Sequence, residues 1–392
     1  MLQLNPEIMR WARETAGMSL DKAAVALHLG GKRKSGVEVL SSYEDGSIEP
    51  TRAVLLKMSR AYKRPLLTFY LPKPPVKAER GEDFRTLPDD RRLEDAASVD
   101  ALIRDVHVRQ RLVRAALDDS EEAQLLPFVG SLRMEQGVPA VAQRMRDLTG
   151  FNLQQFRKRR SVSEAFNYAR ALVEQTGIFV MLIGNLGSHH SNLSAQVFRG
   201  FALSDEIAPF IIINDQDAPS AWAFTLLHEF AHVLLGLTGI SGGGYEQKVE
   251  RFCNDVASQV LLPGDELNAW RPVYGEPNSL VAEINNFASS RKISRSLVAY
   301  RMYLSGSIDE ATWQLLSKTF QDMWLKEKSI QKDKARASES GPSYYVVKRH
   351  RVGGALVDMV RRTLAEGTLT PTKAGKVLGV KPINVEPLLA NA

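Results

Sequence analysis

The feature that most constrains this sequence is the run of residues 221–237 (AWAFTLLHEFAHVLLGL), which is almost wholly apolar yet carries two histidines and a glutamate. The length and composition of the run, together with Pro219 just before it, predict a buried helix. His228 and His232 are four residues apart, so both imidazoles project from one face of that helix. Polar side chains are costly in a core unless they are paired. The spacing therefore points to a metal ion shared by the two histidines.

Glu229 lies one position after the first histidine and so about 100° further around the helix. From there it cannot easily join the same coordination face, but it can reach a water bound to the metal. Zinc lowers the pKa of such a water to about 7, and a nearby carboxylate can then take its proton. We predict a zinc site with Glu229 as the general base; the alternative is a chance motif whose histidines are simply hydrogen-bonded in the core.

A catalytic zinc site needs three protein ligands and one open position. The next predicted helix, residues 245–262, carries Glu250, which we favour as the third ligand over Glu246, one turn earlier. Cys253 could bind zinc as a thiolate, but it lies about 300° around the helix from Glu250. We therefore expect Cys253 to be a small core residue.

Three short apolar runs, at residues 177–183, 197–203 and 210–213, predict buried strands. The rest of the chain reads mainly as helix. The first 70 residues form four short helices, and Ser19 is in position to cap the second of them. The proline-rich run at residues 71–75 then marks a boundary. The fold class we expect is α+β, mostly α, with one small sheet.

Charge divides this chain of 392 residues, which is too long for one ordinary core, into basic ends and an acidic middle. Residues 1–80 hold 14 Lys and Arg against 8 Asp and Glu, and residues 325–392 hold 13 against 6. Such ends favour contact with a polyanion, although they could serve solubility alone. One cysteine, no membrane-length apolar run and no signal peptide lead us to expect a cytoplasmic protein.

The histidine motif, followed by Val249-Glu-Arg-Phe-Cys-Asn254 and Val260-Leu-Leu-Pro263, resembles the ImmA/IrrE family of bacterial metallopeptidases over about residues 165–320. The resemblance implies a gluzincin-like fold, with zinc on His228, His232 and Glu250 and with Glu229 as base. It also implies cleavage of a transcriptional repressor in response to stress or DNA damage. No certain group for stabilising an oxyanion stands out; the candidates are Tyr245, His189 and His190.

Two N-terminal segments resemble the helix-turn-helix of XRE-type (Cro/C1) repressors: Met18-Ser-Leu-Asp-Lys-Ala-Ala24 and Leu40-Ser-Ser-Tyr-Glu-Asp-Gly46. That resemblance implies a third helix in the major groove of double-stranded operator DNA. The candidate DNA-binding residues are Lys32, Arg33, Lys34, Ser35 and Ser41. The turn at residues 30–36 is longer than usual, so the start of the recognition helix stays open. A bundle used only for protein contact is the alternative.

The C-terminal residues 353–389 contain a segment, 370–379, that looks like the capped first helix of a second helix-turn-helix-like pair. Basic side chains that would suit a phosphate backbone are Lys348, Arg349, Arg351, Arg361 and Arg362. A dimerisation or docking element is an equal alternative. The Lys-, Ser- and Ala-rich stretch before this unit predicts a flexible linker.

We therefore predict a helix-turn-helix domain (1–75), a helical connecting region (76–164), a zinc metallopeptidase domain (165–325), a linker (326–343) and a C-terminal helical unit (344–392). The function we expect is a DNA-binding transcriptional regulator, compatible with a homodimer. Its zinc endopeptidase would cleave or control a repressor or partner protein in a stress response. One alternative is a regulator whose peptidase fold is a non-hydrolytic sensor or docking module. The other is an antitoxin-like repressor of its own operon.

Overall fold

The structure is a computed structural model that describes residues 3–31, 34–75, 92–187, 191–237, 244–270, 272, 277–337, 341 and 343–390. These residues are mostly helical with one three-stranded sheet, which confirms the predicted α+β, mostly α class. None of the described helices combines the length and the apolar character that crossing a membrane requires. The helices, including three short 3-10 helices, are α1 (Pro6–Glu14), α2 (Leu20–Ala26), α3 (Gly36–Glu44), α4 (Arg52–Ala61), η1 (Leu66–Tyr70), α5 (Arg92–Asp119), η2 (Met134–Gln136), α6 (Val138–Thr149), α7 (Leu153–Arg157), α8 (Val162–Glu174), α9 (Pro219–Leu234), α10 (Gly244–Leu261), α11 (Gly264–Ala269), α12 (Pro277–Arg291), α13 (Arg295–Leu304), α14 (Glu310–Ala337), α15 (Tyr344–Val352), α16 (Gly354–Ala365), α17 (Pro371–Leu378), η4 (Pro382–Asn384) and α18 (Val385–Ala390).

The sheet consists of β1 (Phe179–Leu182), β2 (Gly200–Leu203) and β3 (Phe210–Ile213), in the order β1-β3-β2. β1 runs parallel to β3, and β2 pairs antiparallel to it on the other side. Every strand residue is buried, because helices cover both faces of the sheet. The three apolar runs in the sequence are thus confirmed as strands.

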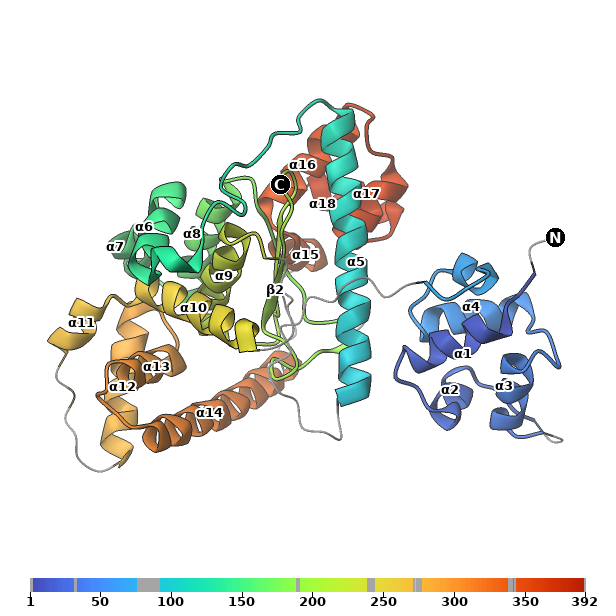
Figure 1. Ribbon diagram of the computed structural model, residues 1–392, viewed down its shortest axis with the longest axis horizontal. Helices are drawn as coiled ribbons and strands as arrows, with labels where there is room; N and C mark the ends of the chain where they lie inside the picture. The colour runs from blue at the N-terminus through green and yellow to red at the C-terminus, as the bar shows by residue number, and fades with distance from the viewer. Residues whose placement is uncertain are drawn as a thin grey trace.

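Two helical layers enclose this sheet (Figure 1). Alternate strand residues such as Val180 and Ile211 pack into one core with α8, α9 and α10. The intervening residues, among them Phe179 and Phe210, pack into a second core with α5 and the C-terminal helices α15–α18. The C-terminal unit therefore forms part of the structure that buries the sheet.

A buried ion pair fixes the C-terminal unit against α8 and β1. Arg170 pairs with Glu174 and donates hydrogen bonds to the backbone carbonyls of Val180 and His350. The Glu174 carboxylate accepts from the backbone N–H groups that open α16. Gly353 has φ +97°, and a Cβ there would lie 2.4 Å from a guanidinium nitrogen of Arg170. Only glycine fits at this junction between α15 and α16.

The interval 326–343, expected as a linker, differs from that expectation. Helix α14 continues through it to Ala337, and Lys328 on this helix donates to the carbonyl of Gln216 at 2.7 Å. Residues such as Lys, Glu, Gln and Ala favour an exposed helix as much as a solvated linker. Composition alone therefore could not separate the two.

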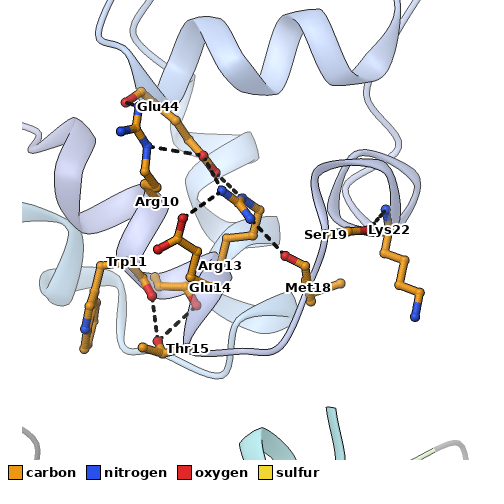
Figure 2. A network of polar contacts seen from close by, with 10 residues as sticks. Arg10, Trp11, Arg13, Glu14, Thr15, Met18, Ser19, Lys22 and Glu44 are labelled. Atoms are coloured by element: carbon orange, nitrogen blue, oxygen red, sulfur yellow. Dashed lines mark hydrogen bonds and ion pairs between the residues drawn. The ribbon is translucent and has the colours of Figure 1, made fainter. Parts of the chain in front are cut away.

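The N-terminal residues form a bundle of α1–α4 and η1 around a core of their own. Ser19 caps α2, as its position in the sequence predicts, and Thr51 caps α4. Figure 2 shows how Arg13 of α1 makes two hydrogen bonds, of 2.7 and 2.9 Å, to the buried carboxylate of Glu44 on α3. A third bond, 3.0 Å long, joins Arg13 to the carbonyl of Met18 before α2. One guanidinium thus fixes α1, α3 and the turn into α2.

Candidate metal centre

Helix α9 is held in place at both ends and along its length. Pro219 occupies its first turn, where a missing N–H is harmless. At the other end the carbonyls of Val233 and Leu234 accept hydrogen bonds from Gly130 and Leu132, at 3.1 and 3.0 Å. Such bonds satisfy carbonyls that a helix end otherwise leaves open. The middle of α9 packs beneath β2 and β3, so its polar side chains have a fixed position.

The two histidines of α9 converge with Glu250, which α10 carries. His228 Nε2 and His232 Nε2 are 3.1 Å apart. The Glu250 carboxylate oxygens lie 3.3 Å from His228 Nε2 and 3.1 Å from His232 Nε2. These three residues form a group that could hold a metal ion. The side chain of Glu246, the alternative ligand, lies outside the described residues.

The spacing of these ligand atoms fits a tetrahedral cation. Zinc at bond lengths of about 2.0–2.1 Å separates neighbouring ligand atoms by about 3.3 Å, the edge of the tetrahedron. The two Nε2 atoms are 3.1 Å apart, and each lies within 3.3 Å of a different oxygen of the Glu250 carboxylate, which is close to that edge. Two imidazoles and one carboxylate leave one tetrahedral position for a further ligand. The side chains present therefore fit a catalytic-type zinc ion.

Electrostatics at the site favour a cation. Burial by itself raises the pKa of the Glu250 carboxyl, but hydrogen bonds from His228 and His232 hold that pKa well below its usual range. Burial lowers the pKa of His232, whereas Cys253, Glu250 and Glu229 raise it well above its ordinary value. The acidic groups thus draw positive charge onto the histidine pair. A metal ion would supply that charge in place of protons.

Glu229 is 2% exposed and sits where the sheet passes closest to α9. A Cβ on Gly200 of β2 would lie 2.9 Å from Glu229 Oε1 and 2.6 Å from Thr225 Cγ2. The glycine therefore makes room for the carboxylate under the sheet. Gly200 is not among the functional residues predicted from the sequence, although a glycine in an apolar strand can signal such a close approach.

Cys253 is fully buried, as expected for a core residue, but it also lies beside the His232 ring. Burial raises the pKa of its thiol, and the adjacent histidine only partly opposes that rise. The group of metal-ligating side chains does not include it. The helical rotation argument therefore separates Cys253 from the ligands but misses its contact with one of them.

Several other residues singled out in the sequence lie outside the described residues: His189, His190, the side chain of Tyr245, Lys32 and Arg33. Lys34 is exposed just before α3. Ser35 caps that helix, since its hydroxyl accepts from Glu38 N and the Glu38 carboxylate accepts from Ser35 N. Ser41 is half-buried on α3.

The C-terminal basic residues are mostly engaged within the protein. Arg349 donates to the carbonyl of Leu388 at 2.8 Å, and Arg351 pairs with Asp215 at 2.8 Å. Ion pairs also hold the two arginines of α16, Arg361 with Asp358 and Arg362 with Glu122. These four arginines therefore stabilise the fold of the C-terminal unit.

Comparison with protein families places a known domain over this centre. Residues 175–303 match the family model of the IrrE N-terminal-like domain (Peptidase_M78). Comparisons with curated proteins and with solved structures found no significant match. The matched range runs from just before β1 into α13 and includes all three residues of the candidate metal group. Residues 175–303 are thus a metallopeptidase-like domain of the IrrE type.

Proposed function

We propose that this domain is a zinc-dependent endopeptidase, with His228, His232 and Glu250 as the metal ligands and Glu229 as the general base. The observation that carries the proposal is the convergence of two imidazole nitrogens and the Glu250 carboxylate, with contacts of 3.1–3.3 Å, near the buried carboxylate of Glu229. A bound Zn²⁺ would act as a Lewis acid and lower the pKa of a water molecule at the site.

The remaining chemistry belongs to the side chains of this chain. Glu229 takes a proton from water and delivers it to the leaving amine of the cleaved peptide. Its low exposure, 2%, means that surrounding protein groups restrict the position of the carboxylate. Because Gly200 has no side chain, the Oε1 atom of Glu229 can occupy its position under β2. Both features support a general base held in one place.

Metal content and cleavage test this proposal separately. We expect the purified chain to contain one zinc by elemental analysis and to cleave members of a proteome-derived peptide library, read by mass spectrometry. Glu229→Gln should keep the zinc and lose cleavage, because it removes only the proton acceptor. The double variant His228→Ala/His232→Ala should lose both, and Glu246→Gln, one turn from Glu250, should keep both. Continued cleavage by Glu229→Gln would contradict the assignment.

We also propose that the N-terminal bundle binds operator DNA, with α3 as the recognition helix. The basic balance of residues 1–80 and the arrangement of α2 and α3 support it. The whole chain is then a transcriptional regulator whose peptidase cleaves or controls a repressor or partner protein under stress. Selection of binding sites from random duplex DNA tests this. If Lys34 contacts one phosphate, Lys34→Ala should weaken DNA binding and reduce the slope of log K against log salt concentration by about 1. A wild-type chain that selects no sequence refutes the proposal of operator binding.

A further inference from the structure

A pocket of about 480 Å³ lies where α5 meets the C-terminal unit, in a part of the chain that the metal centre does not use. Its wall includes Arg109 of α5, Tyr344 of α15, Lys376 of α17 and Lys381 just before η4. Basic and neutral polar groups dominate this wall, whereas the core beneath it is apolar. The pocket therefore differs from a packing gap.

Two cations converge beside Gly379, a residue of the pocket wall: Arg109 also belongs to the wall, whereas Lys348 lies next to it. Gly379 ends α17 with φ +66°, and a Cβ there would lie 2.9 Å from both terminal nitrogens of Arg109. The same Cβ would lie 3.1 Å from Lys348 Nζ. The Arg109 guanidinium on α5 and the Lys348 ammonium on α15 thus both lie close to Gly379.

The carboxylates nearby do not balance this positive charge. Asp105 accepts hydrogen bonds from Arg109 and from Lys376, both at 2.6 Å. Asp215 also acts on Lys348, but it pairs with Arg351 at 2.8 Å. Among the described residues, Asp105 thus serves both Arg109 and Lys376, and Lys348 has only the partial influence of Asp105 and Asp215. The site has an excess of positive charge that an anion would neutralise.

Burial and the crowding of positive charge both lower the pKa of Lys348. Burial, with the charges of Arg109 and Arg351, lowers the pKa of its ammonium to about 8. The bonds of Arg109 to Asp105 and to the carbonyl of Val377 hold its guanidinium fixed. A fixed guanidinium beside an ammonium offers the donor geometry that phosphate oxygens accept well.

We propose that this pocket binds the phosphate group of a small phosphorylated ligand. The basic side chains of the pocket wall are confined to one shallow depression, which suits a compact anion better than a duplex, because a duplex needs an extended exposed basic face. The arginines on the rest of this unit are engaged with protein groups. The proposal is independent of the peptidase, since it uses none of the residues at the metal centre.

Isothermal titration of the full-length protein with inorganic phosphate and with pyrophosphate tests the proposal. We expect saturable binding of one equivalent, and a loss of affinity of at least about tenfold in Lys348→Met, because a hydrogen bond to a charged group is lost. Lys381→Ala is a second variant, exposed enough to leave folding intact. Lys373→Ala is the matched control, since this lysine is exposed on α17 but does not line the pocket.

A parallel titration with a duplex DNA of random sequence identifies the source of the phosphate. Binding of both phosphate probes that weakens in Lys348→Met and Lys381→Ala, with Lys373→Ala unchanged, supports the proposal. Three results overturn it. The wild-type protein binds neither phosphate nor pyrophosphate, or Lys373→Ala lowers the affinity for these probes as much as Lys348→Met does, or Lys348→Met lowers only the affinity for the duplex. Circular dichroism melting of each variant checks that the fold is kept.

Discussion

Removal of the Glu174 carboxylate provides a direct test of how the C-terminal unit is attached to the sheet. Glu174 and its partner Arg170 have side chains only 10% and 6% exposed, and their charged groups are 3.1 Å apart. Burial raises the pKa of Glu174 and lowers that of Arg170, so each charge depends on the other to remain in the core. Glu174→Ala leaves a buried guanidinium without its counter-charge and opens the backbone N–H groups of α16. We expect a loss of about 3–5 kcal/mol in the free energy of unfolding.

Equilibrium unfolding in urea measures that loss, and Glu122→Ala is its control. Glu122 pairs with Arg362 at 3.0 Å in a pair whose side chains are 33% and 52% exposed. Exposed pairs of this kind contribute about 0–1 kcal/mol. Hydrogen exchange should show α15 and α16 opening first in Glu174→Ala. Equal destabilisation by Glu174→Ala and Glu122→Ala would refute the argument that burial makes the difference.

Three further outcomes are expected. Gly200→Ala should lower kcat/KM strongly while the zinc content stays near one, because the new methyl group displaces Glu229. Urea unfolding of this variant should show a free energy of unfolding lower by about 1–3 kcal/mol, the cost of overpacking. Added Zn²⁺ should stabilise the metal-free wild type by about 2.7 kcal/mol at 100 times Kd, seen as a higher Tm, with no shift in His228→Ala/His232→Ala. Pyrophosphate binding should take up protons just above pH 8: the Lys348 pKa is about 8 in the free protein, so the ammonium is partly deprotonated there, and a bound anion raises that pKa. Titration in buffers of different ionisation enthalpy measures the uptake, which should vanish in Lys348→Met.

The metal group was accessible to sequence reasoning because its geometry is local. A separation of four residues fixes the relation between His228 and His232 in any helix. The packing of the next helix beside the first one was enough to predict an acidic ligand there, but it left Glu246 as an alternative to Glu250. The three strands were predicted for a similar reason, since short, largely apolar runs are typical of strands buried on both faces.

The features that the sequence did not reveal depend on residues far apart in the chain. Nothing near Gly200 indicates that a carboxylate from α9 will lie 2.9 Å from its added Cβ. Nothing in the sequence around Arg170 indicates that Gly353, far along the chain, will lie against its guanidinium. The basic C-terminal residues suggested a surface for nucleic acid, because a sequence shows charges but not the carboxylates and carbonyls that engage them.

The unit that folds around the metal centre is larger than the range that matches the family. Residues 175–303 supply the sheet and, on one of its faces, α9 and α10, whereas α8 of the same face precedes this range. The other face presents Phe179, Phe201 and Phe210, and these pack into a core formed largely by α5 and α15–α18. α15 also reaches α9 itself, where the rings of His350 and Trp222 are 6.4 Å apart. Because an apolar sheet face cannot remain in water without cost, the C-terminal helices are a structural requirement of the peptidase-like domain, and any ligand they bind acts on an element that touches the metal-site helix.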